Sequence, residues 1–163
     1  AKNPDKQLRP ASITKIMTAI IAIESNKLDD IITVDQSILK SYGSGIYIQV
    51  GEEISLRDLV YGLMLRSGND AALMISSYIS GSEKDFVKRM NEKAKELGMN
   101  NTTFVNSSGL DNTDSGNYST AYDMGLLMSY AMKNNDFRTI TGTKKHIVKT
   151  NYKTYSWTNK NKI

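Results

Sequence analysis

The feature that most restricts the fold is an apolar segment that begins a few residues after Pro10. Its apolar residues fall on every side of a helix instead of along one stripe, which is typical of a helix buried all round. These residues are Ile16, Met17, Ala19, Ile20, Ile21, Ala22 and Ile23. We therefore expect a buried helix over about residues 11–25, with the rest of the chain packed around it.

Two reactive side chains, Ser12 and Lys15, lie at the start of this predicted helix. Residues three apart lie one turn apart on one face, so the hydroxyl and the amine can reach each other. Burial lowers the pKa of a lysine, and a neutral lysine can accept the proton of a serine nucleophile. Unpaired N–H groups at a helix N-terminus can also stabilise an oxyanion. The alternative is an ordinary N-cap serine followed by a lysine whose stem reaches solvent, and the pair alone does not exclude it.

The composition argues against several classes of protein. With 163 residues, 39% of them hydrophobic, the chain has one domain's worth of sequence and enough apolar side chains for a core. The net charge of +4, from 21 basic and 17 acidic residues, is mild and scattered, so we expect no nucleic acid as a partner. Zero cysteines exclude disulfides and thiolate metal sites, and we expect neither a metal nor a cofactor. Because no apolar run approaches ~18 residues, a membrane would be contacted only through a segment outside this chain.

Periodicity and capping residues predict a mainly helical chain with a few short strands. Helices are expected over about residues 56–65, 71–79, 82–97 and 120–132. Strands are expected at Ile31–Val34, at Ile46–Val50 and within about residues 144–158. The chain would then form one partial catalytic domain, with a helical region over about residues 27–140 and the start of a sheet region over about 144–163.

Two further candidates for a functional role are weak when each is taken alone. Ser67-Gly68-Asn69 lies between two predicted helices, and Gly68 permits a tight joint that can point a hydroxyl and an amide into a cleft. The same three residues are also an ordinary helix-breaking turn. His146, the single histidine, has no Asp or Cys at a ligand spacing, and we interpret it as a strand or surface residue.

Taken together, the motifs resemble one family. S-x-x-K at Ser12–Lys15 followed by an S-x-N element at Ser67–Asn69 is the order found in class A β-lactamases and penicillin-binding proteins. The chain resembles the low-molecular-weight penicillin-binding proteins over nearly its whole length, and specifically the D-alanyl-D-alanine carboxypeptidases. The segments that carry the resemblance are Pro10–Ala19, Ser67–Ala72, Asn101–Phe104, Ser108–Leu110, Tyr118–Ala121 and Asp123–Met124. The resemblance implies an α/β (α+β) fold of the β-lactamase/transpeptidase type, with the helical region present and the central antiparallel sheet incomplete.

The same resemblance implies a role for each site residue. Ser12 would be the acylated nucleophile and Lys15 its proton acceptor. Ser67 would relay a proton to the leaving D-alanine, and Asn69 would bind the amide backbone of the substrate. The implied substrate is a peptidoglycan stem peptide ending in D-Ala-D-Ala, with β-lactams as covalent inhibitors. The implied location is the extracytoplasmic bacterial cell envelope, and no cofactor or metal is implied.

The third motif of the family, K-T-G on a strand of the sheet, is not found in the chain. Three near matches each lack the glycine or the lysine: Lys149-Thr150-Asn151, Lys153-Thr154-Tyr155 and Thr141-Gly142. We therefore expect a chain that begins late and stops before this strand. Such a chain would be inactive alone, because one oxyanion donor and the carboxylate anchor would be missing. It would also leave Ile16, Ile20 and Ile23 without the sheet that covers them, and would associate through them.

Two alternatives remain open at this point. A β-lactamase of the same fold is disfavoured, because S-G-N replaces S-D-N and no convincing glutamate loop for deacylation is found. A noncatalytic cell-wall binding or structural protein would keep the groove but lack the third motif. The missing K-T-G strand keeps this second alternative open.

The first prediction concerns the nucleophile. Labelled penicillin, incubated with the intact protein, should modify Ser12, because this serine lies one turn from Lys15 at the start of the predicted buried helix. Digestion and mass spectrometry of the labelled peptide measure the position of the adduct. Label on any other serine would refute the assignment.

Overall fold

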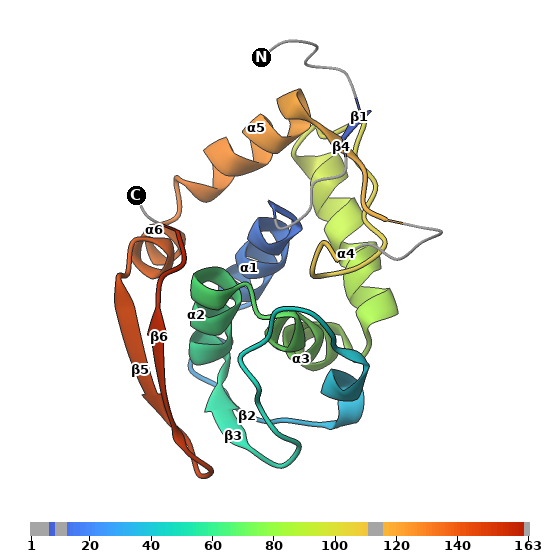
Figure 1. The fold of residues 1–163 in the computed structure, drawn as a ribbon. Helices are drawn as coiled ribbons and strands as arrows, with labels where there is room; N and C mark the ends of the chain where they lie inside the picture. The colour runs from blue at the N-terminus through green and yellow to red at the C-terminus, as the bar shows by residue number, and fades with distance from the viewer. Residues whose placement is uncertain (1–6, 9–12, 111–115, 162–163) are drawn as a thin grey trace.

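A computed structural model of the chain describes residues 7–8, 13–110 and 116–161. The helices are α1 (Thr14–Glu24), α2 (Leu56–Arg66), α3 (Asn69–Ser80), α4 (Glu83–Glu96), α5 (Ala121–Ala131) and α6 (Asn135–Thr141), with a short 3-10 helix η2 (Gln36–Lys40). The strands are β1 (Gln7–Leu8), β2 (Ile31–Thr33), β3 (Glu53–Ser55), β4 (Ser119–Thr120), β5 (Lys145–Lys149) and β6 (Thr154–Thr158). They pair antiparallel as β1 with β4, β2 with β3, and β5 with β6 (Figure 1).

Helix α1 is the centre of the fold, as its apolar pattern predicts. It contacts α2, α3, α4, α5 and α6, which lie around it in Figure 1. The expectation that Ile16, Ile20 and Ile23 are exposed is wrong, because their side chains are only 6%, 0% and 6% exposed. Helices from distant parts of the sequence cover every face of α1, so its burial needs no further sheet. The chain was expected to associate through these three isoleucines, and their burial removes the reason for that expectation.

The ends of the helices follow the capping signals in the sequence. The side chains of Ser55, Ser82 and Thr120 accept hydrogen bonds from the backbone N–H three residues later, and these caps begin α2, α4 and α5. Helix α6 is a further element that the sequence analysis did not separate from its surroundings. Asn134 caps it by accepting from the backbone N–H of Phe137, and Phe137 and Ile140 anchor it in the core.

The predicted strand at Ile46–Val50 is wrong. Ile46 and Ile48 are buried, as an alternating pattern suggests, but this segment pairs with no strand among the described residues. Its backbone N–H groups donate to the carboxylate of Asp70, at 3.0 Å from Ile46, 2.8 Å from Tyr47 and 3.3 Å from Ile48. Tyr47 also has a left-handed backbone, with φ of 64°. A buried carboxylate on α3 therefore replaces the strand ladder here.

The β5–β6 hairpin confirms the predicted strands near the end of the chain, and it packs against α2. Its attachment to the loop before β3 depends on Glu52, which is fully buried. Tyr155 donates to both oxygens of Glu52, at 2.7 and 2.6 Å, and Thr150 donates to one of them at 2.5 Å. Burial and the Glu52 carboxylate raise the pKa of Tyr155, so its hydroxyl stays a donor.

His146 on β5 has a partner that its sequence context did not indicate. Its Nε2 lies 2.8 Å from Oδ1 of Asp58, and its ring stacks on Tyr61 with centroids 3.6 Å apart. Both partners belong to α2, so His146 joins the hairpin to that helix. The interpretation as a strand residue is confirmed, and the acidic partner lies 88 positions away in the sequence.

The fold generates a prediction about two helical glycines. A Cβ at Gly62, on α2, would lie 2.8 Å from Cδ1 of Ile46 and 3.3 Å from the ring of Trp157, whereas a Cβ at Gly125, on α5, would meet nothing within 4 Å. Alanine favours a helix over glycine by about 1 kcal/mol, but overpacking a core costs about 1–3 kcal/mol. We expect Gly125→Ala to raise the melting temperature and Gly62→Ala to lower it.

Thermal unfolding of the two purified variants beside the wild type measures this difference. Because both substitutions are the same chemical change in a helix interior, Gly125→Ala is the matched control. Equal stabilisation by the two alanines would show that the contact among α2, Ile46 and Trp157 is loose.

Candidate active site

Lys15 is the buried lysine of α1 and the first element of the site. Its side chain is 5% exposed, and its Nζ donates to the backbone oxygen of Ser108 at 2.8 Å. Burial first, and the positive charge of Lys160 second, lower the pKa of Lys15 from 10.5 to about 8. A substantial fraction of this amine is therefore neutral near pH 8, and a neutral amine can accept a proton.

The loop around Ser108, whose backbone oxygen accepts from Lys15, is held in place by buried polar groups. The backbone oxygen of Ser107 accepts from the hydroxyl of Thr18 at 2.6 Å. Oε2 of Glu83, at the start of α4, accepts from both the backbone N–H and the hydroxyl of Ser107, at 3.1 and 2.8 Å. Asn117 is fully buried and donates to the Thr14 hydroxyl at 2.9 Å. These contacts tie the chain around Ser107 and Ser108 to both α1 and α4.

Asn117 also fixes the preceding part of this segment. Its side-chain oxygen accepts from the backbone N–H groups of Val105 and Asn106, at 2.6 and 3.1 Å. Its amide nitrogen donates to the side-chain oxygen of Asn106 at 3.0 Å. A buried amide with all its hydrogen-bonding capacity used specifies one loop conformation, so the carbonyl that meets Lys15 has a defined position.

The joint between α2 and α3 contributes Ser67 and Asn69, as predicted. Ser67 ends α2 with a left-handed backbone, φ 53° and ψ 42°, which is uncommon for a residue other than glycine. Gly68 follows in a crowded position, where a Cβ would lie 3.2 Å from a carboxylate oxygen of Asp70. The sharp joint brings Ser67 into the lining of the candidate site, and strain of this kind is typical of functional positions.

Asn69 has hydrogen-bond partners for its two nitrogen atoms but none, among the described residues, for its side-chain oxygen. Its backbone N–H donates to the oxygen of Ser44 at 2.8 Å, and its side-chain nitrogen donates to the oxygen of Tyr42 at 2.8 Å. The side chain is buried, yet its Oδ1 accepts no hydrogen bond from the described part of the chain. An unpaired buried acceptor costs about 1–3 kcal/mol, and a ligand N–H would satisfy it.

Three of the four predicted site residues meet in one pocket. Lys15, Ser67 and Asn69 line a cavity of about 280 Å³ together with Gly43, Ser44, Ser108, Gly109 and Leu110. Ser12, the predicted nucleophile, lies outside the described residues. The sequence analysis gave no role to Ser108 or to the Gly43–Ser44 turn, although Ser108-Gly109-Leu110 is among the segments that carry the resemblance.

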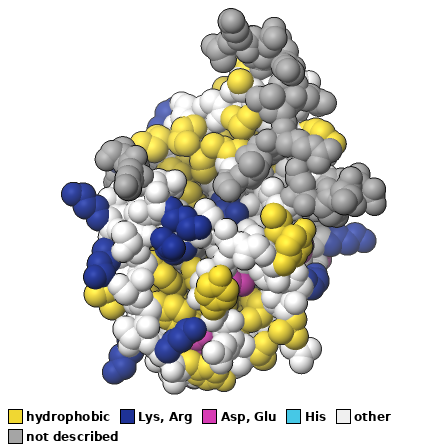
Figure 2. Space-filling view, viewed as in Figure 1, with side chains coloured by type: hydrophobic (Ala, Val, Ile, Leu, Met, Phe, Trp, Pro, Cys, Tyr) yellow, Lys and Arg dark blue, Asp and Glu magenta, His cyan; other side chains and the backbone are white. Residues whose placement is uncertain are grey.

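The charges on this side of the molecule are mostly positive. Figure 2 shows Lys and Arg side chains spread over the visible face and little acidic surface among them. Such a field favours the approach of an anionic ligand. Among the described residues, no group of three or more His, Asp or Glu side chains is placed to hold a metal ion, and no helix is long and apolar enough to cross a bilayer.

Comparison with known proteins identifies the family. The family model described as D-alanyl-D-alanine carboxypeptidase matches residues 1–163. The chain belongs to this family. The resemblance drawn from its motifs is thereby confirmed.

Individual members of the D-alanyl-D-alanine carboxypeptidase family agree with this assignment. The chain is 38% identical to the D-alanyl-D-alanine carboxypeptidase DacF of Bacillus subtilis over 161 residues, which cover 96% of this chain and 41% of DacF. It is 38% identical to the D-alanyl-D-alanine carboxypeptidase of Streptomyces sp. strain K15 over 167 residues, covering 95% of this chain and 57% of that protein. The chain therefore spans only part of these relatives.

Solved structures confirm the predicted fold class. A D-alanyl-D-alanine carboxypeptidase from Mycobacterium tuberculosis superposes with a TM-score of 0.91 at 28% identity, covering 98% of this chain and 60% of that one. A mutant of the Streptomyces K15 DD-transpeptidase superposes with a TM-score of 0.88 at 34% identity, covering 98% and 68%. The helices and small antiparallel sheets of this chain thus form part of the transpeptidase-like fold.

The lowered pKa of Lys15 generates a prediction about pH. In the intact protein, the NMR resonance of the Lys15 ε-carbon should titrate with a midpoint near pH 8, and Lys160→Met should raise that midpoint because a neighbouring positive charge is lost. Between pH 8 and 10.5 the unfolded chain binds one more proton at Lys15 than the folded chain does. The Lys15 contribution to the free energy of unfolding should therefore rise with pH across this window.

Lys149→Met, which removes an exposed charge on β5, is the matched control and should leave the midpoint unchanged. A midpoint above pH 10 in the wild type would mean that the Lys15 amine is well hydrated, contrary to its burial.

Proposed function

We propose that the protein containing this chain is a serine-type D-Ala-D-Ala carboxypeptidase. It removes the terminal D-alanine of peptidoglycan stem peptides, and β-lactams acylate the same serine. The observation that carries this proposal is one pocket that holds a buried Lys15 of lowered pKa beside Ser67 and the unpaired oxygen of Asn69. Residues 1–163 would be the helical part of the catalytic domain, located in the bacterial cell envelope.

The proposed reaction has two steps. The Ser12 oxygen attacks the carbonyl carbon between the two D-alanines while the neutral Lys15 amine takes the hydroxyl proton. Ser67 relays that proton from Lys15 to the departing nitrogen, the C–N bond breaks, D-alanine leaves, and Lys15 is neutral again. Water then attacks the acyl-serine ester, the ester C–O bond breaks, and the shortened peptide leaves with Ser12 restored.

The contacts of Lys15 and Asn69 support these roles. A neutral amine has two N–H groups and one lone pair, and its bond to the Ser108 oxygen uses one N–H and leaves the lone pair for the serine proton. The open Oδ1 of Asn69 can accept the N–H of the substrate amide, because its own nitrogen is already committed to Tyr42. The two groups thus divide the work between proton transfer and substrate positioning.

A β-lactamase or a noncatalytic binding protein of this family are the competing functions. All three would offer the same pocket, but only a carboxypeptidase releases D-alanine, and only a β-lactamase turns over penicillin quickly. A noncatalytic protein would not form an acyl-serine. Measuring both release of D-alanine and the lifetime of the penicillin adduct separates the three.

The prediction that tests this proposal is a substitution of Lys15. In the intact protein, Lys15→Arg should lower the rate of acylation by penicillin by roughly 10²-fold or more, because a guanidinium stays charged and cannot accept the proton. Release of D-alanine from diacetyl-L-Lys-D-Ala-D-Ala should fall in parallel.

Lys93→Arg is the matched control, since Lys93 is also buried but forms a salt bridge with Glu24 at 2.9 Å outside the pocket. It should keep near wild-type rates. Acylation of a folded Lys15→Arg protein at the wild-type rate would leave Lys15 as a structural cation only and would overturn the mechanism.

A further inference from the structure

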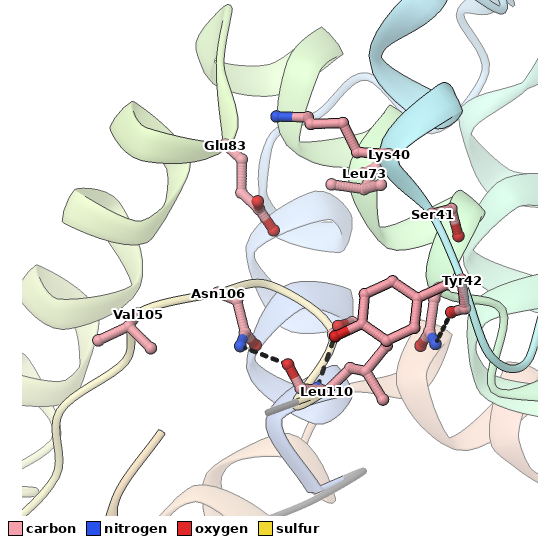
Figure 3. A pocket seen from close by; sticks show the side chains of 10 residues that line it. Lys40, Ser41, Tyr42, Leu73, Glu83, Val105, Asn106 and Leu110 are labelled. Carbon is pink, nitrogen blue, oxygen red and sulfur yellow. Dashed lines mark hydrogen bonds between the residues drawn. The ribbon is translucent and has the colours of Figure 1, made fainter. Parts of the chain in front are cut away.

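A second pocket adjoins the candidate active site. It has a volume of about 240 Å³ and lies between the Lys40–Tyr42 segment, the start of α4 and the chain from Val105 to Leu110 (Figure 3). The two pockets share Asn69, Ser108 and Leu110 in their walls. The two pockets therefore lie next to each other.

Two opposite charges face this second pocket. Figure 3 shows the Glu83 carboxylate directed into it from α4, and the Lys40 side chain running along its rim from η2. Neither charge forms a salt bridge with the described residues. Glu83 uses Oε2 to hold Ser107, while no described residue donates to its Oε1. Within the described part of the chain, one carboxylate oxygen of Glu83 and the ammonium of Lys40 thus have no partner.

The rest of the wall is suited to a hydrocarbon stem. Leu73, Tyr42 and Leu110 also line the pocket. The ring of Tyr42 and the side chain of Leu110 are both drawn in Figure 3 as part of the pocket lining. A flexible side chain with methylene groups would find apolar surface there before its end reaches the charged rim.

Asn69 fixes which part of a substrate comes next to this pocket. Under the proposed function, Oδ1 of Asn69 accepts the amide N–H of the D-alanine that becomes the acyl group. The residue that precedes this D-alanine then lies at the wall shared by the two pockets. One extended residue spans about 3.5 Å, so the side chain of that preceding residue can enter the second pocket directly.

We propose that the second pocket is a specificity subsite for a zwitterionic side-chain end, an ammonium together with a carboxylate, on the residue before the two D-alanines. Glu83 binds the ammonium through Oε1, and Lys40 binds the carboxylate. This inference rests on the proposed function. It makes Glu83 and Lys40 specificity-determining residues that take no part in proton transfer.

Three peptides test the subsite on the intact protein. Each ends in D-Ala-D-Ala, and the preceding residue is diacetyl-L-lysine with no charge, Nα-acetyl-L-lysine with an ammonium, or Nα-acetyl-meso-diaminopimelate with both groups. We expect kcat/KM to rise along this series by on the order of tenfold between the first and the last peptide, since charge-assisted hydrogen bonds are made.

Two variants assign the charges. Glu83→Gln keeps a carbonyl oxygen for Ser107 but loses the charge, so it should remove the advantage of both ammonium-bearing peptides over the uncharged peptide, measured as the ratio of their kcat/KM values within the same variant. Lys40→Met should remove only the further advantage of the diaminopimelate peptide. Asp85→Asn and Lys88→Met, which remove exposed charges from the same helix α4, are the matched controls and should leave the order intact.

The penicillin reaction separates the two proposals, because acylation of the serine does not need this subsite. If penicillin acylates the protein normally but the three peptides are turned over equally, the subsite proposal is wrong and the proposed function stands. An equal loss for all three peptides in Glu83→Gln would show that Glu83 only holds Ser107, and would also overturn it. Absence of both acylation and D-alanine release would overturn the proposed function, and the subsite with it.

Discussion

The hydrogen bond between the buried amine of Lys15 and the backbone oxygen of Ser108 is the constraint on which the site depends. An ammonium inside a helical core is costly, and the protein lowers this cost by shifting the pKa to about 8 and by offering one well-placed carbonyl. That carbonyl belongs to a loop, and loops are mobile unless their backbone groups are satisfied. Glu83, Thr18 and Asn117 form hydrogen bonds with the backbone of this loop. The position of the Lys15 amine therefore depends on residues from three separate parts of the chain.

Much of the helical framework could be predicted because its signals are local. A serine or threonine followed three residues later by an aspartate marks where α2, α4 and α5 begin, and the apolar spacing marks which face is buried. The Ile46–Val50 segment shows where such reasoning fails. Its alternating pattern is that of a strand, but the carboxylate of Asp70, more than twenty residues further on, takes its N–H groups. A hydrogen-bond acceptor on a distant helix leaves no trace in the local pattern.

The candidate site divides in the same way. Lys15, Ser67 and Asn69 could be predicted from motifs, because their spacing within one helix or one joint reflects their chemistry. The residues that position them could not. Ser108 lies 93 positions from Lys15, and Asn117 lies 103 positions from Thr14, and nothing in a single sequence pairs positions so far apart. The burial of α1 is a similar case, since its cover comes from five helices and not from the sheet that the resemblance implied.

The end of the β5–β6 hairpin ties the electrostatics of Lys15 to a part of the chain that does not line its pocket. Arg66, the last residue of α2, donates to the backbone oxygen of Thr158 at 2.9 Å, and the backbone N–H of Lys160 donates to the oxygen of Leu65 at 3.0 Å. These bonds fix the chain beyond β6 against the same helix end that presents Ser67. They also bring the charge of Lys160 near enough to help lower the pKa of Lys15. The chain that follows β6 is thus bonded to the C-terminal end of α2, where Ser67 lies. A change in the packing of the β5–β6 hairpin would therefore alter both the position of Ser67 and the pKa of Lys15.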